Sequence, residues 1–205
     1  MKRIFAILFA LMLALALFAG CGAKDEDGDV VEEDIVVVEP PLVQRYFDIL
    51  SGETYHTKTL KHMDDGDVTT ELFAKDGKLA ITVESPLVTK HIIIKDGFSY
   101  EIDDGEQAVT TATIDDAALA TYDTSLDPED LTIVRSGRDR FAGEEMDYEE
   151  IEVVGTRVMY FLKNGILMGT RSEVEGVTTD VEYLIVDEEV PDSVFDIPEE
   201  YTFLD

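Results

Sequence analysis

Residues 76–97 read DGKLAITVESPLVTKHIIIKDG, and this stretch decides the fold class. It begins and ends on Asp-Gly, a pair that favours a two-residue hairpin turn. Between the turns, Leu79, Ile81 and Val83 alternate with smaller or polar residues, which is typical of a strand with one buried face. Residues 92–94 are three isoleucines without alternation, so we expect that strand to be covered on both faces. Strands joined by such short turns predict an antiparallel sheet.

The same pattern extends in both directions, so from Tyr55 onward we expect a meander in which each strand pairs with the next. Glu175-Gly176 is a weaker turn signal, and the strong two-residue turn pairs are Asp65-Gly66, Asp76-Gly77, Asp96-Gly97, Asp104-Gly105 and Asn164-Gly165.

One strand, residues 144–154, changes phase part-way along. Met146 and Tyr148 fall on one parity, and Ile151 and Val153 fall on the other. A bulge near Glu149-Glu150 would keep all four apolar side chains on the same side, and we therefore predict one there.

Two segments depart from the strand pattern. Apolar residues recur at helical spacing in residues 42–50, which predicts a helix that ends near Ser51-Gly52. Residues 113–122 carry Asp115-Asp116 before an alanine-rich run, and they predict a second helix inserted between two groups of strands. In the tail, Val194, Phe195 and Ile197 are expected to plug an end or edge of the sheet.

Residues 1–20 have the pattern of a secretory signal. Lys2 and Arg3 precede an uncharged apolar run, and Phe18-Ala19-Gly20-Cys21 closes it. This tetrapeptide resembles the lipobox of bacterial lipoproteins, although Phe18 stands where that family more often has leucine. The resemblance implies that Cys21 is the lipid attachment site. It also implies a protein anchored at the extracytoplasmic face of a bacterial membrane, with a Gram-positive surface favoured. Two acyl chains on one residue suffice for stable anchoring.

Beyond the signal we expect an acidic, lipid-anchored tether at residues 21–41 and one β-rich domain at residues 42–205. Removal of the signal changes the formal net charge from −30 to −32, because Lys2 and Arg3 leave with it. Such a charge argues against nucleic acid or anionic lipid as a surface partner. Cys21 is the single cysteine, so no intramolecular disulfide can form and the domain depends on its core for stability.

Most of residues 42–201 resembles the LolA/LolB superfamily, which includes LppX/LprG-type lipoproteins and RseB-type sensors. The residues that carry the likeness are Tyr160-Phe161-Leu162-Lys163-Asn164-Gly165-Ile166-Leu167 and the closing Pro191-Asp192-Ser193-Val194-Phe195-Asp196-Ile197-Pro198-Glu199-Glu200-Tyr201. The resemblance implies an α+β fold with a mainly antiparallel, strongly curved sheet. Such a sheet forms a half-open barrel, with short helices on its concave face. Carriers in this family bind acyl chains in that concavity.

No motif indicates catalysis, a cofactor or a metal site. Asp25, Asp27 and Asp29 alternate as in a calcium loop, but the required glycine and glutamate positions hold valines. His56 and His62 would lie about 20 Å apart on a strand, too far to share a zinc ion. Glu149-Glu150 could be a paired carboxylate, but a solvated strand that faces lysine or arginine is the favoured interpretation. We therefore expect a protein that is not an enzyme and uses no cofactor.

The apolar strand faces allow two interpretations, because a filled core and an open groove use the same residue types. In the first, the predicted groove residues line a hydrophobic groove for a lipid or another apolar ligand; they are Leu79, Ile81, Val83, Ile92 and Ile94. In the second, these residues form a filled core. The protein is then a sensor or interaction module whose acidic surface meets a protein partner.

Overall fold

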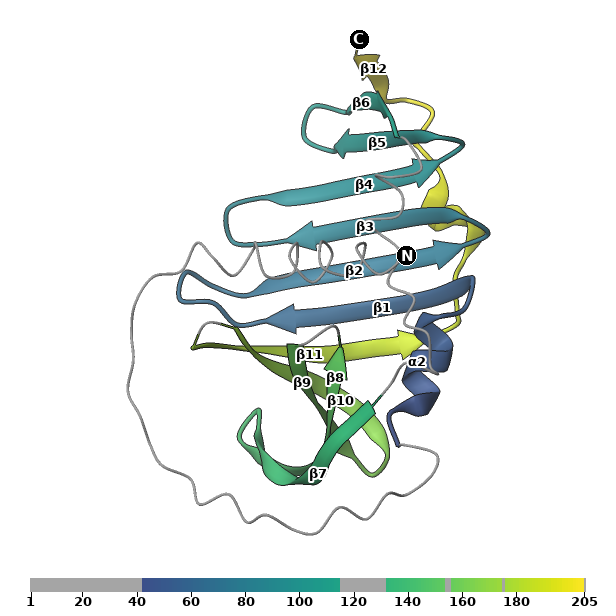
Figure 1. Ribbon diagram of the computed structural model, residues 1–205. Helices are drawn as coiled ribbons and strands as arrows, with labels where there is room; N and C mark the ends of the chain where they lie inside the picture. Colours follow the sequence, from purple (N-terminus) through teal and green to yellow (C-terminus); the bar gives the residue numbers. More distant parts are fainter. Residues whose placement is uncertain (1–41, 115–131, 154–155, 175, 205) are drawn as a thin grey trace.

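The computed structural model describes residues 42–114, 132–153, 156–174 and 176–204 (Figure 1). These residues form one α-helix, α2 (Gln44–Leu50), one short 3-10 helix, η2 (Asp192–Phe195), and a single twelve-stranded sheet. The predicted α+β class with a mainly antiparallel sheet is confirmed. The predicted signal, the tether with Cys21, and residues 115–122 of the second predicted helix lie outside the described residues.

The strands fall into two groups along the chain. The first group is β1 (Thr54–Lys61), β2 (Val68–Lys75), β3 (Lys78–Glu84), β4 (Thr89–Lys95), β5 (Phe98–Asp103) and β6 (Ala108–Thr113). The second group is β7 (Thr132–Phe141), β8 (Glu144–Val153), β9 (Thr156–Lys163), β10 (Ile166–Val174) and β11 (Val177–Asp187). The last strand is β12 (Thr202–Leu204).

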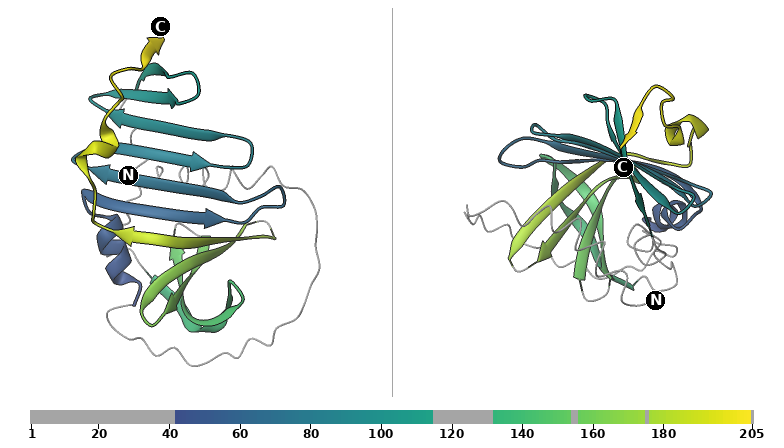
Figure 2. Two further views of the ribbon diagram at one scale, coloured as in Figure 1. Left: turned by 180° about the vertical axis from the view of Figure 1, so that it is seen from behind. Right: turned by 90° about the horizontal axis from the view of Figure 1, so that it is seen from above.

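Each group is an antiparallel meander, as the sequence predicts. In space the strands follow the order β12-β6-β5-β4-β3-β2-β1-β11-β10-β9-β8-β7. Strand β1 pairs with both β2 and β11, so it joins the two groups into one sheet. The terminal β12 adds to β6 as a parallel edge strand. The second group bends away from the first, and the sheet is strongly curved without closing (Figure 2).

The turn chemistry is confirmed at three of the five strong pairs. Asp76-Gly77, Asp96-Gly97 and Asn164-Gly165 all have positive φ at both residues, the geometry that matches the twist of a hairpin. The other two predictions are wrong about loop length. Asp103 pairs with Ala108, so Asp104-Gly105 belongs to a four-residue connection. The loop around Asp65-Gly66 runs from the end of β1 to the start of β2.

The bulge predicted near Glu149-Glu150 is wrong. Strand β8 pairs with β9 in unbroken register, and the irregularity lies instead in the neighbouring β7, between Ile133 and Arg135. As a result Met146 and Tyr148 face one side of the sheet and Ile151 faces the other. Both faces of this part of the sheet are packed with apolar side chains, so apolar residues of β8 are buried on either side without a bulge.

The face that carries Ile151, Leu162 and Leu167 packs against α2, and we call it the helix face. The opposite face we call the tail face, because the C-terminal segment packs on it. Figure 2 shows α2 within the angle between the two groups of strands, whereas the C-terminal segment lies outside that angle. The helix face is therefore the concave one, as the family resemblance implied.

The tail face has a filled core. Ala80, Ile93, Ile102 and Val109 are buried there beneath Phe195, and Val194 and Ile197 pack beside it. The tail residues were expected to plug an end or edge of the sheet; instead they cover one of its faces, and the edge strand is formed by β12 further along the chain. Lys95 Nζ donates to the Phe195 carbonyl at 2.7 Å, and Lys75 pairs with Asp192 at 2.7 Å, so both lysines hold the tail down.

A second cluster fills the tail face of β7–β10. The rings of Phe141 and Phe161 stack with centroids 4.5 Å apart, and Met146 and Tyr148 complete the buried group. Phe141 reaches across the sheet to Gly169, where a Cβ atom would overlap both the Phe141 ring and the Val181 carbonyl oxygen. Gly169 is thus the residue that permits this aromatic pair.

We expect Gly169→Ala to lower the free energy of unfolding by about 1–3 kcal/mol, because the added methyl overpacks the Phe141–Phe161 stack. Urea denaturation measures this change. Gly105→Ala is the matched control, since its Cβ would meet only a flexible Asp103 oxygen in an exposed turn, and it should cost under about 0.5 kcal/mol. Equal stability of the two variants would contradict the packing described here.

Candidate ligand-binding site

Helix α2 is held on the concave face by the carboxylate of Glu149. Glu149 Oε1 accepts a hydrogen bond from the backbone N–H of Leu42 at 2.9 Å, and Oε2 accepts one from Val43 at 2.9 Å. Val43 is the N-cap of α2, so its N–H is one that a helix start leaves without an intrahelical partner, and Leu42 directly precedes it. Glu149 is only 5% exposed. The predicted solvated strand is wrong, because Glu149 and Glu150 are both 5% exposed. The expected basic partner is found only for Glu150, which pairs with Arg135, whereas Glu149 binds backbone.

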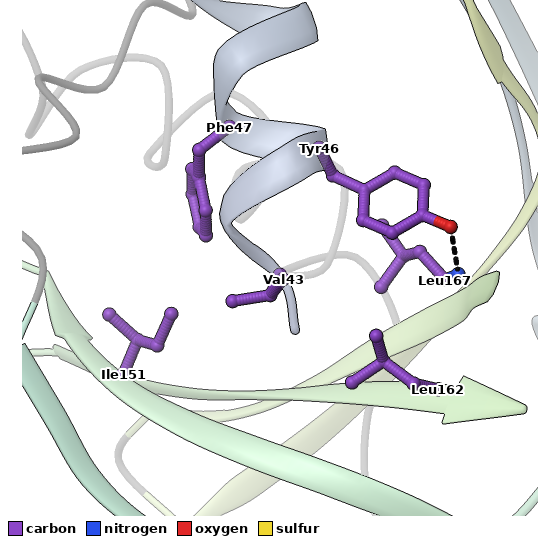
Figure 3. Packing of buried hydrophobic residues seen from close by; sticks show 6 residues of the cluster. All are labelled: Val43, Tyr46, Phe47, Ile151, Leu162 and Leu167. Atoms are coloured by element: carbon purple, nitrogen blue, oxygen red, sulfur yellow. Dashed lines mark hydrogen bonds between the residues drawn. The ribbon is translucent and has the colours of Figure 1, made fainter. Parts of the chain in front are cut away.

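The other attachment of α2 is the side chain of Tyr46 (Figure 3). Its hydroxyl donates to the Gly165 carbonyl at 3.1 Å and accepts from the Leu167 N–H at 2.8 Å. Gly165 lies in the β9–β10 turn and Leu167 is the second residue of β10, so the tyrosine connects the helix to that hairpin. Val43 and Phe47, both under 2% exposed, pack beneath the helix against the sheet.

A cavity of about 400 Å³ lies between α2 and the two strands β10 and β11. Ligand pockets in proteins typically range from about 300 to 1,000 Å³, so this one is at the small end. Most of its wall is apolar, and the lining residues are Arg45, Tyr46, Ile49, Ile166, Leu167, Met168, Tyr183, Leu184, Ile185 and Val186. None of them is acidic, in a chain with 46 acidic residues.

The rim of this cavity is apolar and open to solvent. Ile166 is 60% exposed and Leu184 is 51% exposed. Leu184 is the extra residue of a bulge, because Tyr183 pairs with Thr59 while Ile185 pairs with Lys58. Large apolar side chains that surround the entrance of an apolar cavity are typical of a binding site for a hydrophobic molecule.

Two polar groups on the cavity wall have no hydrogen-bond or ion-pair partner among the described residues. The Tyr183 hydroxyl makes no hydrogen bond there, and burial raises the pKa of this tyrosine. Burial also raises the pKa of Tyr160, which packs against the same buried cluster. The Arg45 guanidinium is exposed and forms no ion pair within the described chain. Neutral tyrosine hydroxyls in an apolar setting can hydrogen-bond the polar end of a ligand.

The predicted groove residues lie on the same concave face. Direct cross-strand pairs run Val186–Thr57–Leu72–Ile81–Ile92, so they connect the cavity wall with β3 and β4. Leu79 pairs with Ile94 in the next row, and Val83 pairs with Lys90. Ile81 and Ile94 are 8% and 1% exposed, and Leu79, Val83 and Ile92 are half-buried. Their role as groove residues stays a prediction.

The residues considered for metal binding or catalysis take part in local contacts. His56 stacks on Phe73 and lies 2.9 Å from Glu71, whereas His62 contacts Asp67 and Glu182, which raise its pKa. Asp103 accepts the Glu106 N–H within its turn. No group of three His, Cys, Asp or Glu residues is placed to hold a metal ion in the described part of the chain. Within the same residues no helix is long and apolar enough to cross a membrane.

Sequence reasoning missed most of the cavity. It predicted the α2 helix, whose Tyr46 and Ile49 belong to the apolar periodicity. It did not find Arg45, Tyr183 or Leu184, because a lone arginine, a strand tyrosine and a strand leucine have no distinctive pattern. The one usable signal was the absence of clean alternation between Tyr183 and Val186, which the bulge at Leu184 explains.

No protein-family model and no curated protein matches the sequence. Among solved structures, the chain is similar to an uncharacterized conserved protein from Thermus thermophilus, with a TM-score of 0.48 at 10% identity. That match covers 80% of this chain and 96% of the other. It is also similar to LprF from Mycobacterium bovis, with a TM-score of 0.41 at 8% identity, covering 78% of this chain and 97% of that one.

A third match is the Pseudomonas aeruginosa MucA/MucB complex, with a TM-score of 0.42 at 14% identity, covering 75% of this chain and 59% of the other.

We expect Glu149→Gln to lower the free energy of unfolding by about 1.5–3 kcal/mol. The amide keeps one acceptor oxygen but sets an NH₂ group against a backbone N–H. Urea denaturation measures the loss, and hydrogen exchange at Leu42 and Val43 should accelerate in the variant. Glu145→Gln, on the same strand but exposed, is the control and should be nearly neutral. Unchanged exchange at the Leu42 and Val43 amides of Glu149→Gln would show that the carboxylate does not hold the helix.

Proposed function

We propose that this protein is a membrane-anchored extracytoplasmic lipoprotein that binds a lipid or other hydrophobic ligand on the concave face of its sheet. The observation that supports binding is the apolar cavity between α2 and β10–β11, with exposed Ile166 and Leu184 at its rim. A hollow lined mainly by aliphatic and tyrosine side chains suits a hydrophobic molecule. Binding of this kind needs no catalytic group and no cofactor.

The concave face provides room for an extended apolar molecule. The cavity wall continues through Val186 into the row that holds Ile81 and Ile92. The tail face, by contrast, is already filled by Phe195 and by the Phe141–Phe161 stack. A ligand on the sheet therefore has one face available, the one on which α2 lies.

The absence of tryptophan from the chain permits a direct test. In Leu184→Trp, the new indole stands at the cavity rim as the single tryptophan. We expect its fluorescence to be quenched by a bromine-labelled acyl chain, because such quenching requires close contact. The full-length chain is reconstituted in phosphatidylcholine vesicles that contain the labelled lipid.

The matched control is Leu87→Trp, which places the single tryptophan at an 86% exposed position in the β3–β4 connection. The proposal requires strong quenching at position 184 and little at position 87. Equal quenching at both positions would indicate general contact with the bilayer, and no quenching at position 184 would overturn ligand binding in the cavity.

The membrane anchor is tested separately. Cys21→Ala removes the proposed attachment site, and we expect the variant to leave the membrane fraction of an expressing bacterium. Two acyl chains on one residue supply the binding energy of the anchor, so the loss should be nearly complete. Western blotting of washed membranes and culture supernatant measures it. Retention of the variant in the membranes at the wild-type level would contradict the anchor.

The second candidate function is a sensor or protein-interaction module. It is favoured by the net charge of −30, which would attract a basic partner surface with an affinity that falls as salt rises. The bromine-quenching experiment separates the two functions, because an interaction module leaves the tryptophan of Leu184→Trp unquenched.

A further inference from the structure

The cavity has one cationic group at its edge, and that group is not neutralised. Arg45 is the second residue of α2 and lines the cavity together with Tyr46 and Ile49. Four other arginines of the described chain pair with carboxylates, namely Arg135, Arg138, Arg157 and Arg171. Arg45 has no such partner within the described residues. On its own helix, Asp48 accepts a hydrogen bond from Gln44 at 2.9 Å.

Among the described arginines Arg45 and Arg140 both lack an ion pair, but only Arg45 lines the cavity. The chain has 46 acidic residues and 16 basic ones, so carboxylates are abundant near almost any cation. The lining of the cavity nevertheless contains no acidic residue. A second cavity, of about 390 Å³, shows the contrast: Lys61 and His62 line it together with Asp64, Asp180 and Glu182. An anion would be repelled there and accepted beside Arg45.

We propose that the ligand of the α2 cavity is an acyl amphiphile with an acidic head, whose chain occupies the cavity and whose head binds Arg45. This inference rests on the proposed function and names the class of its ligand. A guanidinium binds a carboxylate or a phosphate through two parallel charge-assisted hydrogen bonds. A neutral head cannot form this pair, so Arg45 favours an acidic head. The Tyr183 hydroxyl, which has no hydrogen-bond partner within the described chain, lies on the same wall and supplies a further donor.

The size of the cavity supports one chain rather than several. About 400 Å³ is near the lower limit for small-molecule pockets. The exposed Ile166 and Leu184 at the rim can cover the part of the chain that emerges. A fatty acid and a single-chain phospholipid share this chemistry, since both combine one acyl chain with an anionic head.

The test uses the Leu184→Trp reporter in the full-length chain, in phosphatidylcholine vesicles at a pH where carboxylic acids are ionised. Dibromostearic acid and dibromostearyl alcohol are compared at equal mole fraction in the bilayer, so both offer the same chain and bromines. We expect the acid to quench at a mole fraction about ten-fold lower than the alcohol, the effect of one charge-assisted contact. A bromine-labelled lysophosphatidylglycerol then distinguishes a phosphate head from a carboxylate head.

Adding Arg45→Met should abolish the preference for the acid while the alcohol still quenches. Arg140→Met is the matched control, because Arg140 is exposed, lies on β7 outside the cavity, and forms no ion pair through its side chain within the described residues. Arg45→Lys keeps the charge and should keep most of the preference. Thermal unfolding of each variant verifies the fold, and Arg45→Gln replaces Arg45→Met if the latter unfolds.

The outcomes separate this inference from the proposed function. Equal quenching by acid and alcohol in the protein with Arg45 intact would overturn the acidic head and leave hydrophobic binding in place. A preference that survives Arg45→Met, or that Arg140→Met removes equally, would overturn the role of Arg45. Quenching by neither probe would overturn the proposed function itself.

Discussion

The arrangement of the concave face depends on one buried carboxylate. Helix α2 has seven residues, too few to be stable in isolation, so its position must come from tertiary contacts. Glu149 supplies the decisive one, since both of its oxygens bind backbone N–H groups at the helix start. A charged acceptor in a buried site forms strong hydrogen bonds and is costly to leave unpaired. Glu149 therefore fixes where the helix begins, and Tyr46 fixes how it lies over β10.

The two faces of the sheet are covered differently. The tail face is filled by side chains of distant segments, with Phe195 from the C-terminus on one group of strands and Phe141 from the β7–β8 hairpin on the other. The helix face is spanned at one end by a short helix that cannot fill the angle between the two groups. This leaves a cavity. Tyr46 of α2 contacts Leu167 of β10, but the space beside Tyr183 of β11 stays open.

Sequence patterns predicted the parts of the fold that local chemistry determines. The turn positions held by Asp76-Gly77 and Asn164-Gly165 have positive φ, and Asp, Asn and Gly are the residue types that favour such positions. The failures came where a distant segment decides the outcome. Met146 and Ile151 face opposite sides because α2 and Phe141 cover both faces of β8, which no pattern within β8 reveals. Glu149 looked like a surface carboxylate for the same reason, since its partners lie more than a hundred residues earlier in the chain.

The same reasoning links stability to binding. The helix that forms one wall of the cavity has only seven residues, and its position depends on the contacts of Glu149 and Tyr46. A ligand that binds between α2 and β10 binds only the folded arrangement, and it stabilises that arrangement in proportion to the logarithm of its concentration over its Kd. Weakening the Glu149 contact must then lower ligand affinity even though Glu149 is absent from the cavity lining, because part of the binding energy is used to hold the helix in place.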